Sequence, residues 1–119
     1  MTIGENKEQY GDRIPAVFVN KAKYFHISSA INGTSDYHQD YKYNLNQWYH
    51  IEIKQDENSN GEIIYSIEID GTTVYEVVNS LPQRFKEIIL YESDPWHPSF
   101  ATFGELKDLT IVNLDKYPA

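Results

Sequence analysis

The chain has 119 residues, the length of one domain, and at this size a folded chain buries roughly two-thirds of the surface that its unfolded form exposes. Hydrophobic residues make up 40% and aromatic residues 14% of it, which excludes a disordered chain. The net charge of -8 argues against nucleic acid and anionic membrane surfaces as partners, because both are negatively charged. The absence of cysteine excludes thiol enzymes, zinc ribbons and disulfide scaffolds. Because no stretch approaches the ~20 apolar residues of a membrane span, we expect no membrane insertion.

A period of two dominates the sequence and predicts an all-β fold. In the stretch 62–70, Ile63, Tyr65, Ile67 and Ile69 fall on one face and polar residues on the other, as in a half-buried antiparallel strand. No long stretch shows a helical stripe of apolar residues. In chain order, the predicted strands are 15–20, 23–31, 48–54, 62–70, 73–78, 86–91 and 106–114.

Turn signals separate these strands, among them Asn60-Gly61 and Asp70-Gly71, which are typical of hairpins. The polar, tyrosine-rich stretch 36–43 predicts a long loop or an edge strand. Since the strand signals recur without a shift in composition, we predict one domain over residues 1–119, a two-sheet antiparallel sandwich, with residues 1–10 and 115–119 frayed. A closed barrel would give much the same number of strands.

Three stretches resemble a known superfamily. Residues 47–53 are similar to its tryptophan-led strand, residues 65–71 to the following strand with an Asp-Gly turn, and residues 103–111 to its closing strand. Together they resemble the laminin-G and concanavalin A-like lectin jelly rolls over residues 46–114. The resemblance implies a jelly-roll fold and, as function, an extracellular module that binds glycans or protein ligands, often with calcium at a loop rim. Galectins share this architecture, but the residues with which galectins bind sugar have no counterpart here.

The loop around Trp96 is the first candidate for ligand contact. Pro95 and Pro98 stiffen it and hold an aromatic ring beside an imidazole. An exposed tryptophan stacks on the C–H faces of sugars or anchors a protein partner, whereas a tryptophan folded inward would close the end of the sandwich. The candidate ligand-binding residues of this loop are Ser93, Asp94, Trp96 and His97.

A second candidate surface lies in the tyrosine-rich stretch. Tyrosine offers a large contact area, and a histidine together with an aspartate could hold a cation. The surface consists of Asp36, Tyr37, His38, Asp40, Tyr41 and Tyr43, of which Asp36, Tyr37 and Asp40 are the ligand-binding candidates. The alternative is a solvated loop whose tyrosines are partly packed. A zinc site needs a third strong ligand, which is not near in sequence, because the four histidines are scattered along the chain.

A calcium loop is one interpretation of the stretch 56–63. Asp56, Asn58 and Asn60 place oxygen ligands at alternate positions before Gly61, and Ca²⁺ prefers such ligands. The glutamate that usually closes such a loop is missing, because Ile67 stands in its place. The other interpretation is a polar hairpin loop.

An enzyme is the least favoured class. Glu68 and Asp70 resemble the carboxylates of glycoside hydrolases built on a jelly roll, but a second essential carboxylate has no counterpart after Asp70. We therefore predict that the chain is not an enzyme, and a glycosidase would need an acid pair assembled from distant carboxylates.

The residues together predict a non-catalytic recognition module that binds carbohydrate or an extracellular protein through loops at the sandwich rim, with calcium as a candidate cofactor. The alternative is a structural or adhesion domain that acts by self-association as a homo-oligomer, or by contacts within a larger parent protein. The first twelve residues do not resemble a signal peptide, whereas Asn32-Gly33-Thr34 is a glycosylation sequon. We therefore expect an extracellular domain of a longer secreted protein, and the alternative is a protein that is soluble inside a cell.

Overall fold

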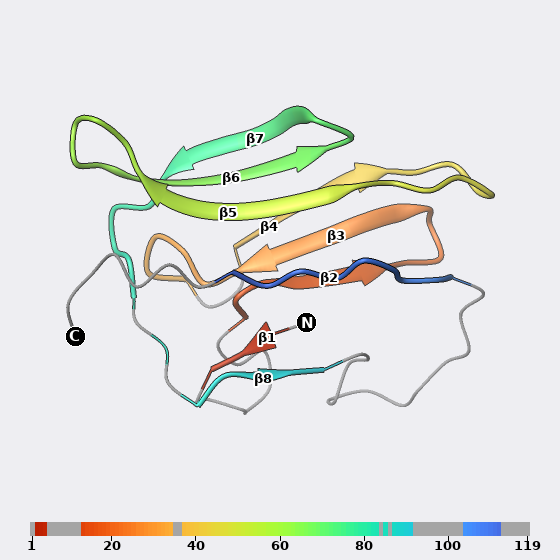
Figure 1. Cartoon of the computed structure of the whole chain (residues 1–119), viewed down its shortest axis with the longest axis horizontal. Coiled ribbons are helices and arrows are strands. Elements are labelled where there is room, and N and C mark those ends of the chain that lie inside the picture. The colour runs from red at the N-terminus through yellow and green to blue at the C-terminus, as the bar shows by residue number, and fades with distance from the viewer. Residues whose placement is uncertain are drawn as a thin grey trace.

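The computed structural model describes residues 2–4, 13–34, 37–83, 85, 87–91 and 104–112, and within them the chain is all-β with no helix (Figure 1). The strands form two antiparallel three-stranded sheets, in the orders β2-β3-β4 and β5-β6-β7, and a two-stranded ribbon of β1 and β8. Their bounds are β1 Thr2–Ile3, β2 Ala16–Val19, β3 Tyr24–Ser29, β4 Tyr37–Lys42, β5 Ile51–Glu57, β6 Ile63–Ile69, β7 Thr72–Val78 and β8 Ile89–Leu90. The predicted all-β class is confirmed.

The second sheet is built from two hairpins, of which β5–β6 has a continuous register and β6–β7 has a register shift between Ile67 and Glu68. β5 pairs with β6 from Ile51 opposite Ile69 to Glu57 opposite Ile63. β6 and β7 are joined at Asp70 and Gly71, which both take left-handed backbone conformations with φ of 52° and 79°. Two consecutive left-handed residues match the twist of the flanking strands. The predicted Asp-Gly hairpin turn is therefore confirmed.

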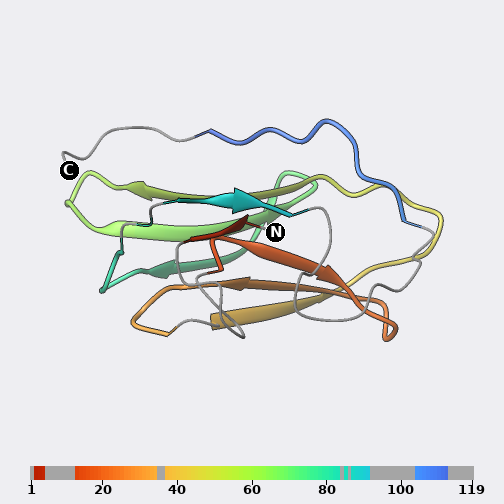
Figure 2. The same cartoon turned by 90° about the horizontal axis from the view of Figure 1, so that it is seen from below.

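The core lies between the two sheets. Ile27 of β3 and Ile67 of β6 are completely buried, and Tyr65 joins them in one apolar cluster. The Ser29 hydroxyl on β3 donates a hydrogen bond of 2.9 Å to the Tyr65 hydroxyl, so a polar contact also links the sheets. The two layers are visible in Figure 2, where β3 and β4 of the first sheet lie below β5 and β6 of the second. Burial raises the pKa of the Tyr65 hydroxyl, an effect that the hydrogen bond from Ser29 partly offsets.

The structure describes two further stretches for which the sequence makes predictions. The stretch 36–43 contributes β4, an edge strand, so the edge-strand interpretation holds for residues 37–42. Thr2 and Ile3 pair with β8 in the two-stranded ribbon. Residues 5–10 and 115–119 lie outside the described residues, so the fraying of the termini stays a prediction.

The strand predicted over residues 106–114 is wrong within the described residues, since 104–112 form no strand and are exposed throughout. Asp108 takes a left-handed conformation with φ of 53°, which breaks the extended chain between Leu106 and Leu109. The described residues contain no helix that is long and apolar enough to cross a membrane.

Candidate functional site

The outer face of the first sheet brings together two histidines and an aspartate from two strands. The β3–β4 register places His26 directly opposite Asp40. His38 precedes Asp40 by two residues on β4, and residues so spaced point to the same face of a sheet. We call His26, His38 and Asp40 the histidine–aspartate cluster.

Short distances join the three side chains of this cluster. Nδ1 of His26 lies 2.6 Å from Oδ1 of Asp40, a hydrogen bond between an imidazole and a carboxyl group. The rings of His26 and His38 have their centroids 4.5 Å apart and are tilted by 34°. One nitrogen or oxygen from each of the three residues lies within 4.8 Å of the other two. The cluster is thus a convergent set of polar atoms.

The cluster is open to solvent. The Asp40 side chain is 48% exposed and that of His26 25% exposed, and His38 is exposed as well. When the Asp40 carboxylate accepts the hydrogen bond, Nδ1 of His26 carries the proton and Nε2 presents a lone pair. An exposed carboxylate beside imidazole nitrogens can accept hydrogen bonds from a ligand or bind a cation.

An aromatic ring and a cation lie beside the cluster on the β2 side. Phe18 of β2 is opposite His26 in the register, and the two ring centroids are 5.8 Å apart. The Arg13 guanidinium lies 5.3 Å from the centroid of Phe18, and its Nη1 donates a hydrogen bond of 3.2 Å to the Ser28 hydroxyl. A row of aromatic and polar side chains therefore crosses the sheet from Phe18 through His26 to Asp40.

Sequence reasoning placed His38 and Asp40 on one candidate surface but did not connect them with His26. His26 lies 14 residues before Asp40 in the chain, and only the pairing of β3 with β4 makes them neighbours. The alternation inside each strand predicts which side chains of that strand share a face with His26 or with Asp40. It does not predict that the two strands pair so that His26 and Asp40 lie on the same face of one sheet.

Most of the other predicted ligand residues cannot be compared with this cluster. Ser93, Asp94, Trp96, His97 and Asp36 lie outside the described residues.

Tyr37 lies on the inner face of β4, where its hydroxyl contacts the Tyr75 hydroxyl of β7. Because β4 alternates, Tyr37 and Asp40 point to opposite faces of the sheet. The burial of Tyr75 and its contact with Tyr37 raise the pKa of Tyr75 to about 12, which fits a hydroxyl turned away from water.

The predicted calcium loop is closed by its own hydrogen bonds. Asp56 belongs to β5, and its Oδ1 accepts from the Glu57 amide. Oδ1 of Asn58 accepts from the backbone amides of Asn60 and Glu62 at 2.9 and 3.0 Å. These contacts are those of the polar hairpin loop, and the calcium site at Asp56, Asn58 and Asn60 stays a prediction.

Two carboxylates face each other on the second sheet. Glu52 of β5 is opposite Glu68 of β6 in the register. Lys54 lies between them, with its Nζ 4.0 Å from a Glu52 oxygen and 3.8 Å from a Glu68 oxygen. The single positive charge of Lys54 offsets one of the two negative charges on this surface, where such ion pairs contribute about 0–1 kcal/mol each. This arrangement is typical of a solvated sheet face.

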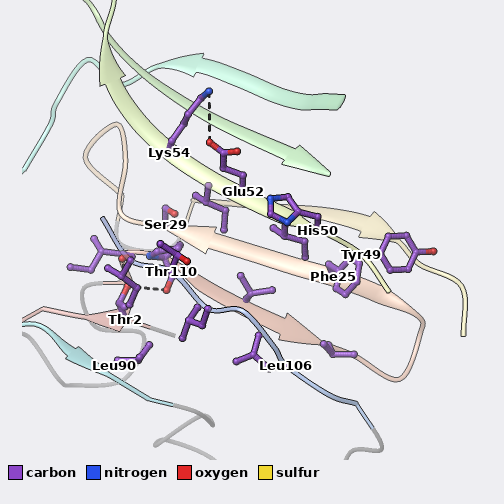
Figure 3. Close-up of a pocket in the computed structure, with 18 of the residues that line it drawn as sticks. Thr2, Phe25, Ser29, Tyr49, His50, Glu52, Lys54, Leu90, Leu106 and Thr110 are labelled. Atoms are coloured by element: carbon purple, nitrogen blue, oxygen red, sulfur yellow. Dashed lines mark hydrogen bonds and ion pairs between the residues drawn. The ribbon is translucent and has the colours of Figure 1, made fainter. Parts of the chain in front are cut away.

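A wide groove borders the exposed segment 104–112. Its walls come from the β2 side of the first sheet, from β5 and from the region of β8 (Figure 3). Phe25, Leu90 and Leu106 line it from three different parts of the chain. Trp48, at 51% exposure, also lines the groove, and the Lys107 ammonium lies 4.4 Å from the centroid of its ring. The groove is mainly apolar, unlike the histidine–aspartate cluster.

Comparison of the chain with protein-family models, with curated proteins and with solved structures found no match.

Proposed function

We propose that this chain is a non-catalytic recognition domain that binds carbohydrate or an extracellular protein ligand. The observation that supports the proposal is the row of rings and a carboxylate on the outer face of β2-β3-β4, in which Phe18 and His26 are half-buried and His38 and Asp40 are exposed. Aromatic and imidazole faces stack on the C–H faces of a sugar, and the Asp40 carboxylate accepts hydrogen bonds from hydroxyl groups.

The resemblance to the laminin-G and concanavalin A-like jelly rolls fits this function. Two antiparallel sheets with a shared core and an Asp-Gly hairpin are compatible with such a fold. The ligand-binding loop of Ser93, Asp94, Trp96 and His97, the calcium loop and the extracellular location in a longer protein remain parts of the same proposal.

A glycan array tests this function. The protein is applied to the array once with calcium and once with EDTA, together with a His38→Ala variant that loses the ring and a His38→Phe variant that keeps one. We expect selective signal for the unchanged protein and at least a tenfold loss for His38→Ala. His38→Phe should retain most of the signal, since stacking needs a ring and no imidazole nitrogen.

His50→Ala is the matched control, because His50 is an exposed histidine outside the cluster. Its signal should equal that of the unchanged protein. A blank array in both buffers, or equal signal from His38→Ala and the unchanged protein, would contradict carbohydrate recognition at this face.

The second candidate function is self-association, as expected for a structural or adhesion domain. Four apolar side chains of the segment 104–112 are more than half exposed, namely Leu106, Leu109, Ile111 and Val112. An exposed apolar segment is stabilised when a second copy covers it. Sedimentation equilibrium should then show a mass that rises with concentration, and the double change Leu109→Lys with Ile111→Lys should abolish the rise. A monomeric mass at every concentration would exclude this function.

A further inference from the structure

We propose that the histidine–aspartate cluster binds a first-row transition-metal dication, with Zn²⁺ as the preferred ion. The cluster offers two imidazole nitrogens and one carboxylate oxygen. This donor set suits Zn²⁺ and its neighbours, whereas Ca²⁺ and Mg²⁺ prefer a shell of oxygens. The inference does not depend on the proposed recognition function.

The backbone places the three ligands as a chelate. His38 and Asp40 are two residues apart on one strand, and His26 faces Asp40 across the ladder. Directly opposite residues have Cβ atoms roughly 4.5–5.5 Å apart, so a neighbouring strand supplies the third ligand without a distortion of the sheet. The pairing of the central strand β3 with the edge strand β4 holds these positions before a metal arrives.

The observed distances are close to those that one ion requires. With bonds of about 2.0–2.2 Å, two ligand atoms of a tetrahedral Zn²⁺ lie roughly 3.3 Å apart. The atoms of the cluster are all within 4.8 Å of one another, and Nδ1 of His26 and Oδ1 of Asp40 are 2.6 Å apart. Since His38 and Asp40 are exposed, rotations of their side chains can bring the three atoms to that separation. Zn²⁺ would take the place of the proton between His26 and Asp40, and that proton would leave to solvent.

Some charges around the cluster favour the binding of a cation and others oppose it. The Asp40 carboxylate and the net charge of -8 favour a cation. The Arg13 guanidinium on the β2 side and Lys42 on β4 oppose it, but Arg13 is directed at Phe18 and Ser28 rather than at Asp40. Three protein ligands leave a fourth position of a tetrahedral ion open to water or to a donor atom of a bound ligand.

Zinc titration of the protein, without an affinity tag and stripped with EDTA, tests the site. ZnCl₂ is titrated by isothermal calorimetry and in competition with a chromophoric chelator. We expect one Zn²⁺ per chain, and we expect His38→Ala, His38→Phe and Asp40→Asn each to weaken the affinity at least tenfold. His50→Ala should leave the affinity within twofold, and CaCl₂ should not compete.

A second readout shows which residues contact the ion. Addition of paramagnetic Ni²⁺ should broaden the imidazole NMR signals of His26 and His38 and leave those of His50 sharp. Melting curves of the variants without metal should match that of the unchanged protein, because His38 and Asp40 are exposed. The absence of zinc binding, equal affinity in His38→Ala, or broadening centred on His50 would overturn the proposal.

The results of the zinc titration and the glycan array distinguish failure of the metal site from failure of the recognition function. A metal site without glycan binding gives a positive titration and a blank array. Glycan binding without a transition-metal site gives a blank zinc titration and an array signal that survives in His38→Phe.

Discussion

Replacement of Ile67 by alanine is expected to lower the free energy of unfolding by about 2–5 kcal/mol, the usual cost of truncating a fully buried aliphatic side chain. Ile67 is 0% exposed and lies in β6, the central strand of the second sheet. It belongs to the cluster that joins the two sheets, together with Ile27 and Tyr65. A cavity at this position removes contacts with both layers, so the loss is large compared with a domain stability of about 5–15 kcal/mol.

Equilibrium unfolding in urea measures this change, and Val74→Ala is its matched control. Val74 lies in the adjacent strand β7 but is 38% exposed. Its truncation should cost less than about 1 kcal/mol, because water already reaches the side chain. An equal decrease in the free energy of unfolding of the two variants would contradict a core centred on Ile67.

The second large effect is expected at Asn79, a buried polar residue that follows β7. Its Oδ1 accepts hydrogen bonds from the backbone amides of Asn32 and Leu81, at 3.0 and 3.2 Å. Its Nδ2 donates to Oε1 of Gln55 at 2.8 Å. Asn79 thereby ties the turn after β3 to the end of β7. Asn79→Ala should cost about 1–3 kcal/mol, since it leaves partly buried partners without their hydrogen bonds.

Asn58→Ala is the control for this variant, measured by the same unfolding experiment. Asn58 also makes three side-chain hydrogen bonds, but all of them lie in an exposed hairpin loop. Water replaces such bonds, so Asn58→Ala should cost less than half as much as Asn79→Ala. If Asn58→Ala lowered the free energy of unfolding as much as Asn79→Ala, burial would not decide how much these hydrogen bonds stabilise the fold.

The sequence by itself determined the local elements of the second sheet. The alternation in 62–70 predicted β6 and the orientation of Tyr65 and Ile67 toward the core. The Asp70-Gly71 pair predicted the hairpin to β7. These features are local, because the side-chain period and the backbone preferences of two turn residues depend on adjacent positions only. The same local pattern failed at 106–112, where a strand also requires a partner that the sequence does not name.

Only the tertiary structure decided which distant residues meet. The pairing of β3 with β4 made His26 a neighbour of Asp40, and the alternation of β4 turned Tyr37 away from both. Register decides such contacts, and a shift of one residue would move every side chain of a strand to the other face. The register depends on the burial of both inner faces in one core, a long-range property that no segment of the chain contains alone.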